Sequence, residues 1–283
     1  MSTPKRHHYI PRMLLKRFSN ERGFFFVYDK RHPDKGVQKR MLENLFVERH
    51  LYTQVDANGA KDVSVETEYL ASLESKASRL FNKLVFATRR GDPPRLTPVE
   101  KDVCIEFFYC QHMRVPERGG RSKEEAYQRS KRRIDFMSQF RSPKGEELSN
   151  VFQDGTFRRM WNNAISEISR IENPVAYEVL SQKQIGVGVI RKPKPMRSFV
   201  IGSNPVLKLA PPIRAHQDDQ VVEFWLPLAR DVAVSFCSSE RDTTVALRDR
   251  HIETLNRNAL DQSAVIAGCS RELIESLVNY TGG

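Results

Sequence analysis

Val187-Gly188-Val189-Ile190 is the first of four short segments rich in strand-forming residues, and these segments decide the fold class of the chain. The other three are Ser198–Ile201, Val221–Trp225 and Val232–Phe236. Branched and aromatic side chains favour extended backbone because they pack well on a pleated surface. Proline-containing stretches separate the segments and mark the connections between strands. The pattern predicts a small mixed or antiparallel sheet within residues 185–240.

The part of the chain before this sheet, residues 61–184, is typical of helices. From Glu66 to Phe86 apolar residues recur every three or four positions, which indicates a helix with one buried face. Thr97-Pro98-Val99-Glu100 has the residues of a capping box and predicts a second, buried helix that ends near Arg114. A third amphipathic helix is predicted over residues 157–182.

The two ends complete the expected architecture. Residues 1–60 contain a predicted strand at Gly23–Asp29 and a predicted short helix at Glu43–Leu51. Apolar side chains close to the terminus should hold this N-terminal arm against the core. The last part of the chain, residues 248–283, predicts helices that break near Gly268.

The composition is that of a folded protein. Hydrophobic residues make up 39% of the 283 residues, and Phe alone occurs 16 times. We expect a single compact α+β domain over residues 1–283, with a central helical bundle, the small sheet and a packed N-terminal arm.

The sequence has no long apolar run and no apolar segment after its first basic residues, so we predict a cytoplasmic protein without a membrane span. Four scattered cysteines predict free thiols.

The net charge of +11 is unevenly distributed. Residues 1–50 hold twelve Lys or Arg against five Asp or Glu, and residues 186–215 hold six basic residues and no acid. If these regions share a face, they form a positive surface suited to phosphate backbones. The candidate substrate-binding residues of the second region are Arg191, Lys192, Lys194 and Arg197. We therefore predict nucleic acid as a partner; the alternative is a basic protein that binds no polyanion.

The strongest candidate for chemistry is the N-terminal stretch Lys5-Arg6-His7-His8-Tyr9-Ile10-Pro11. Two histidines stand there in a basic and aromatic setting, and histidine changes charge near neutral pH without assistance. On a strand their side chains point to opposite faces, so one of them, His7 or His8, would serve as general acid or base. The alternative is a basic segment that anchors the terminus to the core.

Two further groups of polar residues are candidates. Gln111 and Arg114 lie at the end of the predicted buried helix, where an arginine needs an internal carboxylate or a bound anion. Glu74 on the preceding helix is the candidate carboxylate, and a structural ion pair is as well supported as ligand binding. Ser203 and Asn204 follow a predicted strand in a tight turn, which would present short polar side chains to a cleft.

In this order along the chain, the motifs resemble those of the bacterial proteins that carry domain of unknown function 4238. The matching residues are His7-His8-Tyr9-Ile10-Pro11 with Leu15 and Phe18, Tyr52, the helix Glu66–Leu84 with Glu74, Gln111, Arg114-x-Pro116, Ser203-Asn204-Pro205-Val206, Pro227-Leu228 and Leu255-Asn256. Many members of that family have an aspartate where this chain has Ser203, which implies an altered site if the acid is chemically active. The resemblance covers nearly the whole chain and implies no settled activity.

These features predict an effector that acts on nucleic acid, most simply a ribonuclease or deoxyribonuclease. The family resemblance implies a place in bacterial antiviral defence or in a toxin-like system. His8 or His7 would be the general acid or base, and Arg114 would stabilise the charge on the phosphate. Gln111 and Asn204 would position the phosphate. The alternative is a non-catalytic module that binds nucleic acid or a phage protein. A divalent metal as cofactor is left open, and the sequence predicts no oligomeric state.

Overall fold

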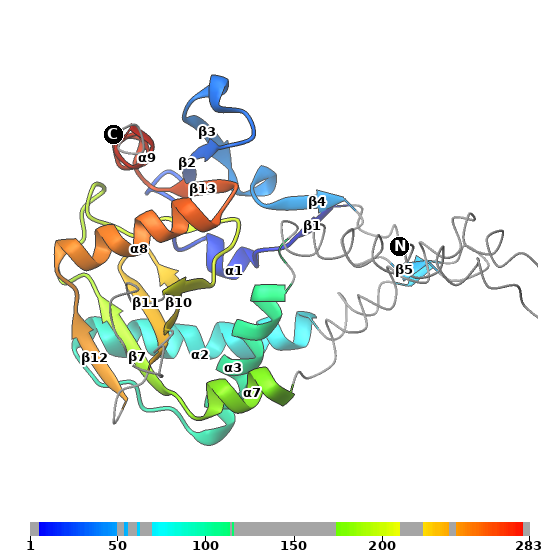
Figure 1. Ribbon diagram of the computed structural model, residues 1–283, viewed down its shortest axis with the longest axis vertical. Helices are drawn as coiled ribbons and strands as arrows, with labels where there is room; N and C mark the ends of the chain where they lie inside the picture. The colour runs from blue at the N-terminus through cyan, green and yellow to red at the C-terminus, as the bar shows by residue number, and fades with distance from the viewer. Residues whose placement is uncertain are drawn as a thin grey trace, which may run out of the picture.

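A computed structural model gives the fold of the chain (Figure 1). It describes residues 6–49, 54–55, 61–62, 70–113, 115, 174–209, 223–237 and 242–279. The N-terminal elements are β1 (Arg6–His8), α1 (Arg12–Leu15), β2 (Phe24–Asp29), η1 (Pro33–Lys35), β3 (Gln38–Met41), η2 (Leu42–Asn44), β4 (Val47–Arg49), β5 (Gln54–Val55) and β6 (Lys61–Asp62). The middle of the chain contains α2 (Ala71–Arg90), α3 (Pro98–Met113), α7 (Pro174–Ser181) and β7 (Gln184–Val189). The remaining elements are β8 (Ile201–Gly202), β9 (Leu207–Leu209), β10 (Glu223–Ala229), β11 (Val232–Cys237), β12 (Thr243–Ala246), α8 (Asp249–Gln262), β13 (Val265–Gly268) and α9 (Arg271–Asn279).

The larger sheet has the strand order β12-β7-β11-β10-β9. It is mixed, because β12 runs parallel to β7 whereas the other neighbouring strands are antiparallel. Every residue of the central strand β11 is buried, which requires cover on both faces of the sheet. Figure 1 shows α2 behind this sheet and α8 in front of it; α2 contacts β7 and β10, and α8 contacts β9. The predicted α+β class is confirmed.

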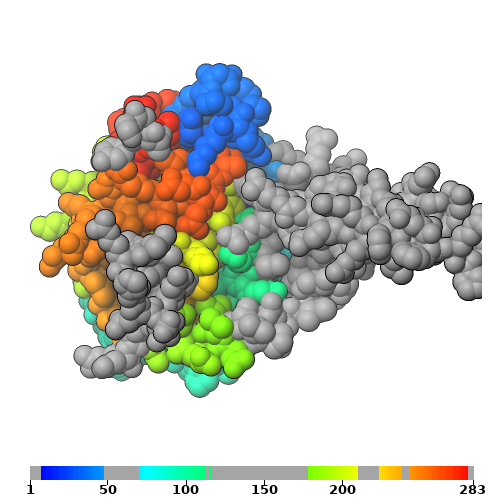
Figure 2. Space-filling model, in the orientation of Figure 1, coloured from blue at the N-terminus to red at the C-terminus, as the bar shows by residue number. Residues whose placement is uncertain are grey.

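The structure adds a second, antiparallel sheet with the order β3-β2-β13-β8. Its central pair joins Phe24–Asp29 to Val265–Gly268, so an N-terminal hairpin pairs with a strand near the other end of the chain. Helix α9 packs on this pair, and Figure 2 shows the blue hairpin beside the red helix. The predicted C-terminal helices and the break near Gly268 are confirmed as α8 and α9, but the break contains strand β13, which was not predicted from the sequence. Val265 to Ala267 is a buried run that has a strand partner on each side.

The central helices pack on one another and on the mixed sheet. Helix α2 ends at Gly91, whose φ of 91° is a left-handed conformation that glycine adopts without strain. The predicted capping box is confirmed: Glu100 N–H donates to Thr97 Oγ1 at 3.2 Å, and Thr97 N–H donates to Glu100 Oε2 at 2.8 Å. Phe81 of α2 meets Phe107 of α3 edge to face, with ring centroids 4.9 Å apart. Within the described residues, no helix has the length and apolar content that crossing a membrane requires.

Two predicted elements differ in the structure. The helix expected at Glu43–Leu51 is only the single turn η2, which is followed by Phe46 at a φ of 54° and by strand β4. Pairing of β4 with β1 satisfies the backbone groups that a helix would have satisfied internally. Of the strand expected at Ser198–Ile201, only Ile201 pairs with a neighbouring strand, β13, as the first residue of β8. Residues 66–69 and 157–173 of two predicted helices lie outside the described residues.

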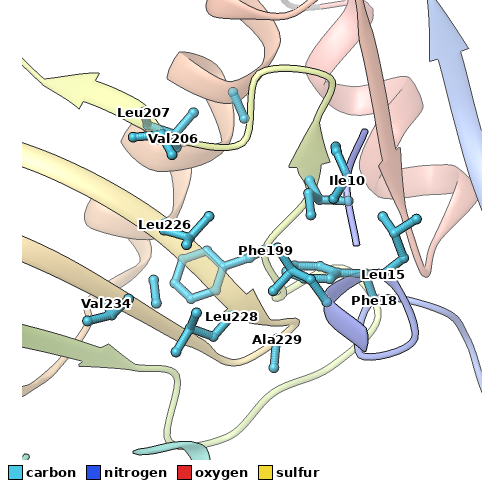
Figure 3. Close-up of a cluster of buried hydrophobic side chains, with 14 of the residues drawn as sticks. Ile10, Leu15, Phe18, Phe199, Val206, Leu207, Leu226, Leu228, Ala229 and Val234 are labelled. Atoms are coloured by element: carbon cyan, nitrogen blue, oxygen red, sulfur yellow. The ribbon is translucent and has the colours of Figure 1, made fainter. Parts of the chain in front are cut away.

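The N-terminal arm is packed against the core, as predicted. Ile10, Leu15 and Phe18 are fully buried. Figure 3 shows them in one cluster with Phe199 and Leu228, which come from the region of the mixed sheet. Burying a side chain of this size contributes about 1.5–3 kcal/mol, so these three residues together hold the arm firmly.

The segment before Ile201 has no neighbouring strand in the described part of the chain, and the side chain of Asn256 in α8 forms hydrogen bonds with its backbone instead. Its Oδ1 accepts a hydrogen bond from Val200 N–H at 3.0 Å, and its Nδ2 donates to the Ser198 carbonyl at 2.9 Å. Asn256 is only 3% exposed, so water does not compete for either bond. The amide therefore closes the hydrogen bonds of a strand-like segment that has no neighbouring strand at this point.

We expect Asn256→Ala to lower the free energy of unfolding by about 2–5 kcal/mol, because two buried backbone groups lose their partners. Asn258→Ala is the matched control: the same change, on the same helix, at a half-buried position, should cost about 1 kcal/mol or less. Urea unfolding of both variants measures the difference. Equal losses would show that Asn256 has no special structural role.

Burial raises the pKa of the Cys104 thiol in α3 from 9.0 to about 12. The folded chain therefore keeps this proton between pH 9 and 12, whereas the unfolded chain releases it, so the thiol lowers stability as pH rises through that window. Above pH 9, the free energy of unfolding of the parent chain should fall faster than that of Cys104→Ala, by on the order of 1 kcal/mol per pH unit. Urea unfolding at several pH values tests this, and parallel pH profiles would contradict it.

Candidate functional site

The N-terminal histidines lie on strand β1, where His7 pairs with Glu48 and His8 with Val47. Neighbouring residues of a strand point to opposite faces of the sheet. The His8 ring is half-buried, and its Nε2 donates a hydrogen bond to the Leu42 carbonyl at 3.2 Å. Because a carbonyl oxygen only accepts, this bond requires the proton on Nε2. His8 thus ties β1 to η2; the His7 side chain lies outside the described part of the structure.

Gln111 at the end of α3 contacts the same arm. It is 1% exposed, and its Nε2 donates to the Tyr9 carbonyl at 2.9 Å. The structure thereby brings Gln111 next to the His8–Tyr9 segment, although the two are far apart in the sequence. Arg114 lies outside the described residues, so its expected pairing with Glu74 is not placed, and Glu74 itself is half-buried on α2.

The Ser203-Asn204 turn faces the connection between α8 and β13. Ser203 Oγ accepts hydrogen bonds from the backbone N–H groups of Ala264 and Val265 at 3.1 and 3.3 Å. Asn204 N–H donates to Ser263 Oγ at 3.2 Å. Both residues are buried. The Ser203 hydroxyl and the Asn204 N–H therefore bond to groups of the protein interior, whereas Asn204 Oδ1 has no partner among the described residues.

The four candidate cations of the second basic region divide into two kinds. Arg197 bonds to Asp249 at 2.6 Å and also donates to two backbone carbonyls, so its role is to hold the connection before β8. Arg191, Lys192 and Lys194 are exposed. The Arg191 guanidinium lies beside Gly91, 3.6 Å from the place where a Cβ of that residue would stand, and so reaches the C-terminal end of α2.

Sequence reasoning missed a strongly basic cleft of about 780 Å³ along α2, which we call the α2 cleft. Three segments form it: residues 16–21 after α1, the C-terminal half of α2, and Arg230 in the turn between β10 and β11. Its charged lining residues are Lys16, Arg17, Glu21, Lys83, Arg89 and Arg230. Five of these six side chains are basic.

Backbone contacts explain why these segments meet. Arg230 N–H donates to the Arg17 carbonyl at 3.2 Å, and the Arg230 carbonyl accepts from Phe199 N–H at 2.8 Å. Burial of Leu15 and Phe18 in the core leaves Lys16 and Arg17 at the edge of the cleft. The pattern of the run Leu14-Leu15-Lys16-Arg17-Phe18 indicates buried apolar residues beside exposed cations. Nothing in the sequence indicates that Arg230 lies next to this run.

Two of the five cations in the α2 cleft have carboxylate partners. Arg89 makes two hydrogen bonds of 2.7 Å to Asp231, and this contact raises the pKa of the Arg89 guanidinium. Lys83 Nζ lies 2.7 Å from Glu100. These pairs neutralise much of the charge along α2.

The other three cations have no carboxylate partner among the described residues. Arg17 is half-buried and donates through Nη2 to Asn82 Oδ1 at 2.7 Å, whereas Nη1 is shielded from solvent and unpartnered. Desolvation lowers the pKa of the Arg17 guanidinium, and the charge of Arg89 lowers it further. Lys16 and Arg230 complete the group, and Glu21 is the single acid in the lining. The cleft therefore attracts anions.

A second hollow, of about 430 Å³, lies between the arm and the β2–β3 hairpin. Tyr9 and Phe46 form its floor with nearly buried rings, and the Arg31 guanidinium at its rim is held by two hydrogen bonds of 2.9 Å to Asp29. Lys35 and Arg40 also line this hollow and both are exposed, whereas the α2 cleft contains the half-buried cation Arg17. Across the described segments, no group of three or more His, Cys, Asp or Glu side chains is arranged to hold a metal ion.

We expect Gln111→Leu to lower the free energy of unfolding by about 1–3 kcal/mol, because the buried Tyr9 carbonyl loses its donor. Hydrogen exchange at the Tyr9 and Ile10 amides should become faster as the arm loosens. Gln182→Leu, at an exposed position after α7, is the matched control and should change neither quantity. Unchanged exchange in Gln111→Leu would show that Gln111 does not hold the arm.

Comparison with known proteins gives one match. No curated protein and no solved structure matches this chain. Residues 6–276 match the family described as Protein of unknown function (DUF4238), which agrees with the ordered motifs in the sequence and includes the arm, the central helices, both sheets and two thirds of α9. Because the match spans nearly the whole chain, the protein belongs to the DUF4238 family.

Proposed function

We propose that this chain binds nucleic acid in the α2 cleft, with the phosphate backbone lying against Lys16, Arg17 and Arg230. The observation that carries the proposal is the Arg17 guanidinium, which is half-buried and has no carboxylate partner among the described residues. A desolvated cation in the wall of a cleft is most stable when an anion occupies that cleft. Phosphate is the anion whose oxygens best match the planar donors of arginine.

The pairing of the other cations in the cleft supports this interpretation. Arg89 and Lys83 are each held by a carboxylate at 2.7 Å, so the fold neutralises the cations that serve its own packing. The other three cations of the cleft have no carboxylate partner in the part of the chain that the structure describes. A low-dielectric wall lined by one sign of charge concentrates the field in the cleft and raises the local concentration of polyanions.

A further cation lies at the C-terminal end of α2. Arg191, which comes from the second basic region of the sequence, reaches the end of α2 near Gly91. Arg17 and Lys16 come from the first basic region. Both regions thus contribute to the C-terminal end of α2, where cations also interact favourably with the helix dipole. A polyphosphate chain that leaves the α2 cleft would meet further positive charge there.

The contacts of three candidate site residues that the structure describes favour binding over hydrolysis. His8, Gln111 and Ser203 each hydrogen-bond to a nearby backbone group, which gives each a structural role. A general base must reach the proton that it abstracts, and these contacts orient the groups toward the protein itself. We therefore favour the non-catalytic alternative, a nucleic-acid-binding module, and retain the nuclease as a prediction that the experiments below address.

The first experiment measures binding of labelled single-stranded RNA, single-stranded DNA and duplex DNA by fluorescence anisotropy, from about 50 to about 200 mM salt. Arg17→Gln with Arg230→Gln should weaken binding about tenfold or more and reduce the slope of log affinity against log salt by about 2. Arg79→Gln removes one charge from an exposed position of α2 outside the cleft and should leave affinity nearly unchanged. Absence of salt-dependent binding to all three nucleic acids would contradict the proposal.

Two further experiments locate the binding surface and test for cleavage of the nucleic acid. Changing Arg191, Lys192 and Lys194 to Glu should weaken binding less than the cleft variants; if only this triple change has an effect, the α2 cleft is not the site. Incubation of the same oligonucleotides with and without Mg²⁺ should leave them intact. Cleavage that His8→Ala abolishes, without a change in thermal unfolding, would instead establish the nuclease.

A further inference from the structure

We infer that the α2 cleft takes single-stranded nucleic acid and that Phe86 is the platform on which one unpaired base stacks. This inference rests on the proposed function and adds the class of nucleic acid and the residue that selects it. Phe86 lines the α2 cleft, and 63% of its surface is exposed. An aromatic ring presented to solvent inside a basic cleft is the arrangement that single-strand binding surfaces use.

The core of the protein does not require Phe86. The buried face of α2 consists of Leu73, Ala77, Leu80, Phe81, Leu84, Val85 and Thr88. Phe81, one turn and a half earlier on the same helix, is fully buried and packs on Phe107. Phe86 lies on the opposite side, where a polar residue would be the ordinary choice. Its exposure therefore fits a ligand-contacting role.

Neighbouring residues hold the ring beside the phosphate site. The Arg90 guanidinium lies 4.6 Å from the centroid of the Phe86 ring, and Arg90 is itself anchored to Asp92 at 2.7 Å. Asn82, one helical turn before Phe86, accepts the hydrogen bond from Arg17. Residues four apart on a helix have Cβ atoms about 5–6 Å apart, so the ring and the guanidinium are neighbours along the same wall.

This geometry distinguishes single strands from duplexes. A base in a duplex is stacked on both faces and cannot offer a face to Phe86, whereas the phosphates of a duplex remain accessible to Lys16 and Arg17. Duplex binding would therefore use the cations alone. A single strand would use the cations and the ring together, and it should bind more tightly.

The cleft does not have the character of a protein-binding patch. Among its described lining residues, Phe86 is the only exposed apolar side chain, because Val85 is buried. The centre of a protein interface is depleted of charge and built from several apolar groups. Here one ring stands among cations, which matches a chain of alternating bases and phosphates.

The test compares Phe86→Leu and Phe86→Trp with the parent chain on a single strand and on a duplex of the same sequence. Phe86→Leu should weaken single-strand binding by about tenfold, with the salt slope and the duplex affinity unchanged, because only the stacking contact is lost. Phe86→Trp should retain the affinity, and a bound base should quench its fluorescence. Phe24→Leu is the matched control: that ring also carries a cation, Lys39 at 3.5 Å from its centroid, but lies outside the cleft.

The outcomes separate this inference from the proposed function. Salt-dependent binding that is equally tight for duplex and single strand, and equally tight in Phe86→Leu, would overturn the stacking inference and leave the proposed function standing. Absence of salt-dependent binding to either nucleic acid would overturn both. An equal loss of single-strand and duplex affinity in Phe86→Leu, with a lower melting temperature, would assign Phe86 a structural role and also overturn the inference.

Discussion

Burial of Leu15 and Phe18 is the contact on which the rest of the α2 cleft depends. These side chains pack into the cluster around Phe199 and Leu228 (Figure 3), and they fix the chain segment between α1 and β2 against the mixed sheet. The residues between and beside them have no room in that cluster, so Arg17 is left at the boundary between core and solvent. The hydrophobic effect thus sets the position of a charge, and the field of the cleft follows from it.

The α2 cleft also shows how one fold can contain both satisfied and unsatisfied cations. Asp231 is 6% exposed, and removing Arg89 would leave its carboxylate buried without a partner. That pair therefore belongs to the structure, where it joins α2 to the turn between β10 and β11. Arg17 contributes in the opposite sense, because desolvation by burial disfavours its charged form. A bound polyanion would relieve this imbalance.

Local sequence signals predicted most elements, whereas long-range pairing decided those that were missed. The Thr97–Glu100 capping box is a short-range pattern and is confirmed as predicted. Strand β13, by contrast, lies in a short apolar run between two helices, and its pairing with β2 on one side and β8 on the other makes it a strand. The same reasoning applies to the site: the sequence indicates that Arg17 and Arg230 are charged, but only the fold shows that they share a cleft.

The serine at position 203, where the family resemblance suggests an aspartate in many members, has a physical explanation in the structure. Ser203 Oγ accepts hydrogen bonds from two consecutive backbone N–H groups at the start of β13. A carboxylate oxygen can accept the same two bonds, and it would do so more strongly because it is charged. The position therefore requires a short side chain with an acceptor oxygen, which both residues supply. A serine at this position makes the contact that aligns β8 with β13 without placing a negative charge in a buried turn.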